Sequence, residues 1–167
     1  NEKPYGMGVF IDIYPYDGLG TTEKEAVTYG MKGDRLSSLC YQSTREHFAI
    51  ETTTSLFRKI IKYPIFIGSK LIGKDYFQKK LNQLVELKEY EDSNYIGCVV
   101  WLSGGKKEIF LRKWFDETVM VPFEKYQFRV PKDYDEVLRH TYGDYMQLPP
   151  EKDRIGHHYF KAYRKDE

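Results

Sequence analysis

Asp12 is the acidic residue whose position the sequence pattern explains least. It lies between two isoleucines in the segment MGVFIDIYPYDGLG (residues 7–20). The alternation of side chains predicts a strand over residues 8–14, with Asp12 on the same face as Phe10 and Tyr14. A carboxylate at this place either faces water at a sheet edge or lies in a cleft opposite a cation. Carboxylate oxygens near a strand end are ligands that Mg²⁺ prefers, so Asp12 is a candidate metal ligand.

The C-terminal tail concentrates basic side chains that suit an anion. Four of them lie close together in the sequence: Arg154, His157, His158 and Lys161. Guanidinium, imidazolium and ammonium groups can together bind a phosphate through charge-assisted hydrogen bonds. Zinc is not indicated, because no further Cys or His lies at a ligand spacing. A solvated basic tail explains the same composition, so both interpretations stay open.

Other motifs have structural explanations. Asp133 and Asp135 form an Asp-x-Asp pair, but they also stand at the start of a predicted helix, where carboxylates cap the helix and interact with its dipole. IGSK (residues 67–70) and SGGK (residues 103–106) contain small residues typical of phosphate-binding loops. Neither follows that motif, and both are predicted to be turns. No local signature indicates a Ser-His-Asp or Cys-His catalytic site.

The composition limits the classes of protein to consider. The 167 residues suffice for one domain, and 26 Lys and Arg balance 25 Asp and Glu, so no overall charge attracts nucleic acid. Aromatic residues make up 16% of the chain. This fits either a tyrosine-rich core or a cleft lined with rings that binds sugars or a quaternary ammonium group.

Two further features bear on where the protein works. Cys40 and Cys98 have no metal-site spacing and are expected to be reduced core residues. The most apolar segment, residues 60–73, is too short and too charged to cross a bilayer. We therefore expect a cytoplasmic protein. Any contact with the membrane is expected to be peripheral, at its inner face.

The helices that must position these side chains follow from periodicity and end signals. Helices are predicted over residues 21–48, 52–63 and 74–90, the first with Thr22 as its N-cap. The third has an apolar face that comprises Phe77, Leu81, Leu84 and Leu87. A last helix is predicted from Asp133, in a capping box with Glu136, to a stop at Gly143.

Strand patterns occupy the stretch between the helices. Residues 94–115 are predicted to form a hairpin that turns at residues 104–105, and residues 118–131 a further strand pair or bent strand. The fold class is therefore α/β of the α+β type. We expect a small, mostly antiparallel sheet with packed helices.

Segments at both ends of the chain resemble the LicD family. GVFIDIYPYDG (residues 8–18) is similar to the family's IDIFPLDG segment. Residues 121–158 are similar to its C-terminal order FE…VP…YDxxLxxxYGDYM…PP…R…HH, and EIFLRKWF (residues 108–115) to the segment before it. The resemblance covers residues 7–165, with a more variable helical middle.

The resemblance implies a phosphotransferase. Such a protein moves phosphocholine or a related phospho-group from a nucleotide-activated donor such as CDP-choline to a cell-surface glycan, a teichoic acid or lipopolysaccharide precursor. The family shares a nucleotidyltransferase-like core with fukutin, in which an Asp-x-Asp pair and a third acid hold Mg²⁺ or Mn²⁺. The resemblance places Asp12 as this third acid. Tyr142 and Asp144 are then expected to shape the substrate cleft, and the four basic tail residues to contact phosphate or acceptor.

The resemblance also implies a missing part. The family's Asp-x-Asp strand would precede Met7, so residues 1–167 are expected to be a single domain, the C-terminal portion of a LicD-like catalytic domain. Because two of three metal carboxylates would lie elsewhere, a non-catalytic glycan- or nucleotide-binding domain, or a partner subunit, is the alternative function. Residues 8–14 would lack a neighbouring strand, so we expect a companion chain or self-association.

Overall fold

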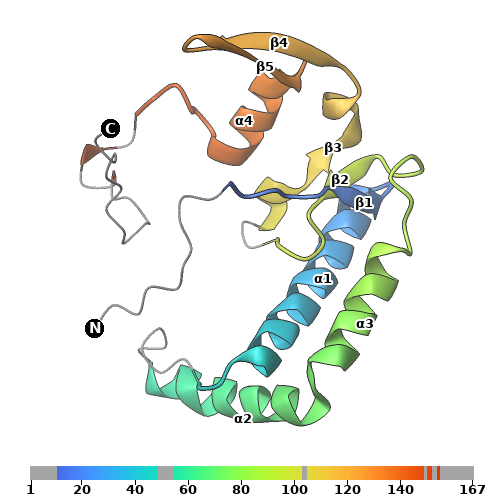
Figure 1. The fold of residues 1–167 in the computed structure, drawn as a ribbon, viewed down its shortest axis with the longest axis vertical. Helices are drawn as coiled ribbons and strands as arrows, with labels where there is room; N and C mark the ends of the chain where they lie inside the picture. The colour runs from blue at the N-terminus through green and yellow to red at the C-terminus, as the bar shows by residue number, and fades with distance from the viewer. Residues whose placement is uncertain (1–10, 49–54, 103–104, 149, 152–153, 155–167) are drawn as a thin grey trace, which may run out of the picture.

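The computed structural model describes residues 11–48, 55–102, 105–148, 150–151 and 154. The helices are α1 (Glu23–Thr44), α2 (Leu56–Ile72), α3 (Lys74–Val85) and α4 (Tyr134–Tyr142), with the short 3₁₀ helices η1 (Gly105–Glu108) and η2 (Arg112–Phe115). The strands are β1 (Asp17–Gly20), β2 (Tyr95–Gly97), β3 (Phe110–Leu111), β4 (Thr118–Phe123) and β5 (Tyr126–Pro131). Small antiparallel sheets and α4 lie at one end, and α1, α2 and α3 form an arm (Figure 1). The predicted α+β class is confirmed.

The strands form two separate antiparallel sheets. β1, β2 and β3 pair in that order, with Asp17 opposite Gly97 and Tyr95 opposite Leu111, whereas β4 and β5 form a hairpin of their own. Both predicted strand pairs are confirmed. However, the connection from β2 to β3 contains η1, which begins at Gly105, and residue 104 of the predicted turn lies outside the described residues.

The strand predicted over residues 8–14 is wrong where the structure describes it. Residues 11–16 belong to no strand, and β1 begins only at Asp17. Pro15 has no N–H to donate to a ladder. Ile11 and Ile13 are each 89% exposed, so their side chains do not pack against a sheet. Residues 8–10 lie outside the described residues.

α1 begins where the sequence predicts. The Thr22 hydroxyl accepts a hydrogen bond from the Glu25 backbone N–H at 3.3 Å, and the Glu25 carboxylate accepts one from the Thr21 backbone N–H at 3.0 Å. These bonds satisfy donors that the first helical turn leaves unpaired. The helix ends at Thr44, and it packs against α2, α3 and β1.

Small residues let the connection after β2 approach α1 closely. Gly30 and Gly33 are buried on α1, where Leu102 packs on Gly30 and Val99 packs on Gly33. A Cβ atom at Gly33 would overlap the carbonyl group and side chain of Val99. The main core lies at this contact and comprises Leu19, Ala26, Leu84, Val99, Leu102 and Ile109.

Gly33→Ala should therefore destabilise the protein. Overpacking of a tight contact costs about 1–3 kcal/mol, which exceeds the gain of up to about 1 kcal/mol in helix propensity. Gly68→Ala in α2 is the matched control, because an added Cβ there meets nothing within 4 Å. Urea denaturation measures both free energies of unfolding. Equal stability of Gly33→Ala and wild type would show that α1 and Val99 are not in such close contact.

α2 and α3 differ from prediction in their lengths. The second predicted helix is confirmed in its described part, but it runs through Pro64 and ends at Gly73. IGSK (residues 67–70), predicted to be a turn, is therefore helical, since one proline removes only one helical hydrogen bond. In α3 the expected apolar face is buried at Phe77, Leu81 and Leu84. Leu87 lies beyond the helix and is exposed.

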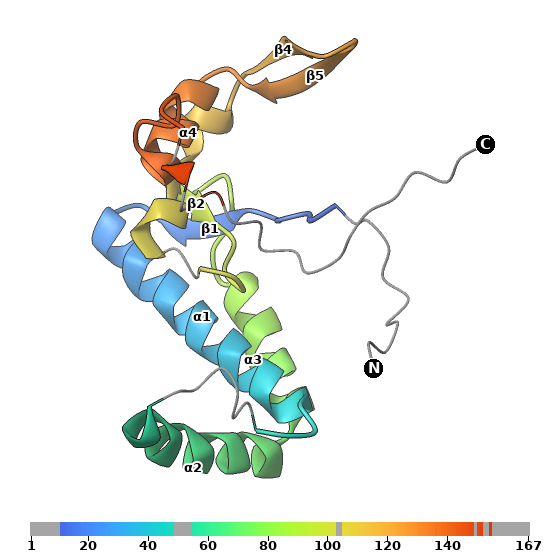
Figure 2. The same cartoon turned by 90° about the vertical axis from the view of Figure 1, so that its left-hand side faces the viewer.

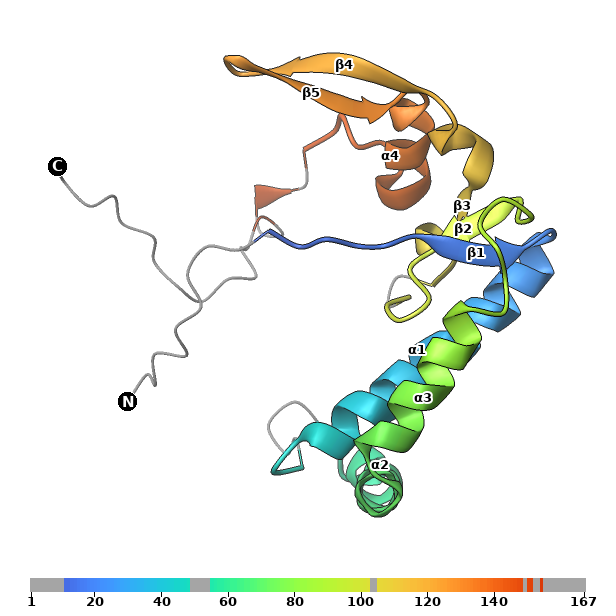
Figure 3. The same ribbon diagram turned by 45° about the vertical axis from the view of Figure 1, so that its right-hand side comes forward.

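α4 lies between the β4–β5 hairpin and the β1–β3 sheet (Figure 3). It ends at Gly143, as predicted, in a left-handed conformation with φ +72° that suits glycine. The predicted capping box is wrong, because Asp133 makes no side-chain cap hydrogen bond. Asp135 instead accepts hydrogen bonds from Arg139 at 2.7 Å and from the Tyr145 hydroxyl at 2.6 Å.

Candidate functional site

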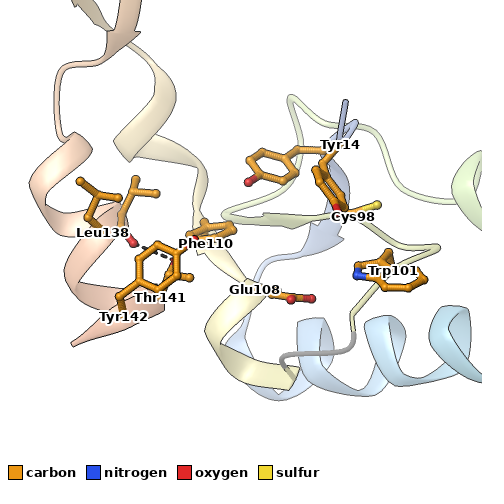
Figure 4. A pocket seen from close by; sticks show the side chains of 10 residues that line it. Tyr14, Cys98, Trp101, Glu108, Phe110, Leu138, Thr141 and Tyr142 are labelled. Atoms are coloured by element: carbon orange, nitrogen blue, oxygen red, sulfur yellow. Dashed lines mark hydrogen bonds between the residues drawn. The ribbon is translucent and has the colours of Figure 1, made fainter. Parts of the chain in front are cut away.

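A cleft of about 340 Å³ opens between α4 and the β1–β3 sheet (Figure 4). The segment before β1 contributes two rings, Tyr14 and Tyr16. The stretch from β2 to β3 contributes Cys98, Trp101, Glu108 and Phe110. α4 contributes Val137, Leu138, Thr141 and Tyr142. Five of these ten lining residues are aromatic, so ring faces and edges dominate the surface of the cleft.

The inner rings are held by their packing. The Tyr16 and Phe110 ring centroids are 5.4 Å apart, and Phe115 meets Tyr16 edge-on at 5.4 Å. Phe110 is only 4% exposed, which fixes this side of the cleft. Tyr14 and Trp101 are about half exposed. The cleft therefore has a rigid aromatic floor and a rim of rings that a ligand can cover.

Glu108 is the charged residue of the cleft. It is the last residue of η1, next to the buried Ile109. Its Oε2 atom is buried and has no hydrogen-bond partner among the described residues. Figure 4 shows its carboxylate between Trp101 and the α4 residues of the lining. Because an unpaired buried carboxylate oxygen is costly, this position favours a cationic ligand.

Burial is the main cause of the pKa shifts at the cleft. It raises the pKa of the Tyr16 hydroxyl, with smaller upward contributions from negative charge on Cys98 and Glu108. Burial also raises the pKa of the Cys98 thiol, with smaller contributions from Asp17 and Glu108. None of the ten residues that line the cleft in the described part of the chain is Lys, Arg or His. The cleft is thus built for a cation with apolar surface.

The structure places the predicted site residues differently. Tyr142 lines the cleft, whereas Asp144 follows Gly143, is exposed and is not part of the lining. Asp12 is exposed and lies two residues before Tyr14, on the segment that leads into the cleft. Its role as a metal ligand stays a prediction.

The predicted anion cluster falls mostly outside the described residues. Arg154 is exposed, and its backbone N–H donates to the Glu151 carbonyl at 3.2 Å. His157, His158 and Lys161 are not among the described residues. The choice between a phosphate site and a solvated tail therefore stays open.

No metal site is assembled within the described ranges. Nowhere in them do three His, Cys, Asp or Glu side chains lie where they could hold a metal ion. The Asp-x-Asp pair of α4 has a structural role at Asp135, because the hydrogen bonds from Arg139 and then Tyr145 lower the pKa of its carboxyl.

No helix in the described part of the chain is long and apolar enough to cross a membrane.

Comparison with known proteins gives one informative relative. The chain is 32% identical over 157 residues to the lipopolysaccharide cholinephosphotransferase LicD of Haemophilus influenzae (strain ATCC 51907 / DSM 11121 / KW20 / Rd). Over the matched region, this similarity supports membership of the LicD family. The match covers 93% of the chain, and the chain spans 57% of the length of this curated relative. No protein-family model and no solved structure matches the chain.

The LicD relationship confirms the family resemblance, but sequence analysis had not identified most of the cleft. Glu108, Tyr16, Trp101 and Phe110 were not among its candidate residues. Two signals pointed towards them. The aromatic excess predicted a ring-lined cleft as one alternative, and the LicD-like segment EIFLRKWF (residues 108–115) begins at Glu108 and includes Phe110.

Proposed function

We propose that this chain is part of a phosphotransferase that moves phosphocholine from a nucleotide-activated donor such as CDP-choline to a glycan. The support is the similarity to a lipopolysaccharide cholinephosphotransferase over most of the chain. A lipopolysaccharide, teichoic acid or related cell-surface precursor is the proposed acceptor. Because nucleotide donors are cytoplasmic and such acceptors carry lipid, we propose that the reaction takes place at the inner face of the membrane.

The observation that carries the proposal is the buried Glu108 Oε2 atom, which has no hydrogen-bond partner among the described residues and lies in a ring-lined cleft. The trimethylammonium group of choline has one positive charge and no N–H, so it cannot be recognised by hydrogen bonds that it donates. Ring faces within about 6 Å and a nearby carboxylate recognise such a cation. A volume of about 340 Å³ falls in the range of small-ligand pockets.

In the proposed reaction the cleft holds the choline end of the donor. An acceptor hydroxyl oxygen forms a bond to the phosphorus that carries choline. The bond from this phosphorus to the bridging oxygen breaks, CMP leaves, and the hydroxyl proton is released. Fixing the choline group between Glu108 and the rings restrains the position of the phosphorus, which is how binding energy lowers such a barrier.

The LicD resemblance implies Mg²⁺ or Mn²⁺, which would offset charge on the phosphates when bound. The described residues do not fit a complete site for such an ion, because no three potential ligands lie together among them. Asp12 can supply only one ligand of the implied set. This same observation favours the second candidate function, a non-catalytic binding domain or partner subunit that presents choline or a nucleotide to another chain.

Calorimetric titration of this chain with CDP-choline, choline, CDP-ethanolamine and CMP tests the proposal. We expect CDP-choline to bind about tenfold more tightly than CDP-ethanolamine, because the ethanolamine ammonium group must lose hydrogen bonds to water on entering a ring-lined cleft, whereas trimethylammonium has no N–H to leave unpaired. Equal affinity for the two donors would contradict the choline assignment. A turnover assay with lipopolysaccharide, followed by release of CMP, separates the enzyme from the binding domain, because only the enzyme releases CMP.

A further inference from the structure

α2 exposes the side chains that a helix of a folded domain normally buries. Of its residues only Phe66 and Ser69 are buried. Large apolar side chains point to solvent along its whole length, and Leu71 is 83% exposed. The most exposed are Leu56, Phe57, Ile60, Leu71 and Ile72. At about 100° per residue, these positions all fall within one half of the helix circumference.

The opposite half attaches α2 to the rest of the molecule. The Phe48 ring, which follows α1, lies 5.7 Å from the Phe66 ring and 5.5 Å from the Tyr63 ring of α2. α2 also packs against α1 and α3. The apolar half therefore points away from these contacts, and the helix is held firmly while it presents that half outwards.

The charges of α2 have one sign. The helix carries Arg58, Lys59, Lys62 and Lys70 and no Asp or Glu. By the same helical geometry, Arg58 borders one edge of the apolar half and Lys70 lies near the other. The Lys70 ammonium group donates to the Arg45 carbonyl at 2.8 Å. A wide apolar face flanked by cations is the pattern of helices that lie in a membrane surface.

The position of α2 suits a flat partner. It lies across the far end of α1 and α3, at an extremity of the molecule (Figures 1 and 2). Its 17 residues correspond to about 25 Å of helix at 1.5 Å per residue. A surface that meets this helix lengthwise thus need not collide with the β1–β3 sheet or the cleft.

We propose that α2 is a docking helix for an anionic membrane surface. Its apolar half inserts at the boundary of headgroups and acyl chains, and the cations at the edges of that half, Arg58 and Lys70, contact lipid phosphates. An anionic lipid surface can bury the apolar face and also neutralise the positive charges. A second copy of the same face could bury the apolar side chains, but its own positive charges would repel those of the first. The inference does not depend on the choline assignment.

Co-sedimentation of the chain with lipid vesicles tests the docking helix. We expect binding to vesicles of phosphatidylcholine mixed with phosphatidylglycerol, and much weaker binding to phosphatidylcholine alone. Arg58→Gln, which removes a cation at the edge of the apolar half, should reduce the affinity for the anionic vesicles about fivefold, at about 1 kcal/mol per cation. Ile60→Glu with Leu71→Glu should abolish binding, because the apolar half no longer inserts.

Leu87→Glu is the matched control, since Leu87 is also exposed but lies outside α2. It should bind vesicles like wild type. Circular dichroism verifies that each variant is folded. If the glutamate variant does not fold, the glutamine variant alone tests the proposal. Absence of binding to the anionic vesicles, or equal binding by all variants, would overturn the proposal. A stable dimer that the α2 glutamates dissociate, without vesicle binding, would show that a second copy is the occupant instead.

Discussion

Glu108→Gln should weaken the binding of choline and CDP-choline roughly thirtyfold, or by about 2 kcal/mol, because the ligand then loses its nearest negative charge. Glutamine keeps the shape of the side chain, so the rings of the cleft stay in place. The stability of the free protein should not fall. The Glu108 Oε2 atom is buried and has no partner in the part of the chain that the structure describes, and removing an uncompensated charge leaves stability unchanged or raises it.

Calorimetry and thermal unfolding together distinguish a binding role from a structural one. A residue that only supports the fold would lose stability and binding in parallel. We expect binding to fall while the melting temperature holds or rises. Glu91→Gln is the control, because Glu91 is exposed and lies outside the cleft. Unchanged affinity in Glu108→Gln would remove the central support for the choline site.

Asp12→Asn should reduce phosphotransferase turnover by at least about a hundredfold, since a metal ligand that offsets phosphate charge contributes several kcal/mol to the transition state. The measurement uses whichever form of the protein releases CMP from CDP-choline. Asp12 is exposed, so the free energy of unfolding should not change. Choline binding at the cleft should also persist, because Asp12 is not part of the lining.

A second readout tests the ligand role of Asp12 directly. Mn²⁺ binding, followed by paramagnetic resonance, should be weaker in Asp12→Asn than in wild type. Asp92→Asn is the control, because Asp92 is also exposed, and it should leave Mn²⁺ binding and turnover unaltered. Normal turnover in Asp12→Asn would mean that the acid of this segment has no part in the chemistry.

The elements that sequence analysis predicted well are those with local signals. The start of α1 at Thr22 and the end of α4 at Gly143 depend on a few neighbouring residues, a cap hydroxyl and a glycine with positive φ. The predicted strand is wrong over residues 11–14 because a strand needs a partner, which the side-chain pattern cannot supply. A helix was correctly predicted up to residue 63, but neither its continuation to Ile72 nor the exposure of its apolar half was predicted.

The cleft was harder to predict than the fold for a related reason. Its walls come from three parts of the chain that are far apart in sequence, represented by Tyr16, Glu108 and Tyr142. No periodicity links them, and a glutamate before an apolar strand is an ordinary surface residue in most proteins. Only the packing of β1 to β3 and α4 brings the unpaired carboxylate and the rings together.

α4 supplies one wall of the cleft without burying any residue of its own. One of its attachments is the contact of the His140 ring with the Lys106 carbonyl at 3.0 Å. Elements with so little buried surface open at a lower free energy than the core. A ligand held between α4 and Glu108 would therefore favour the closed arrangement by mass action. Binding in the cleft and local unfolding of α4 are then coupled: a bound ligand reduces the population in which α4 is open, and opening of α4 reduces the affinity for the ligand.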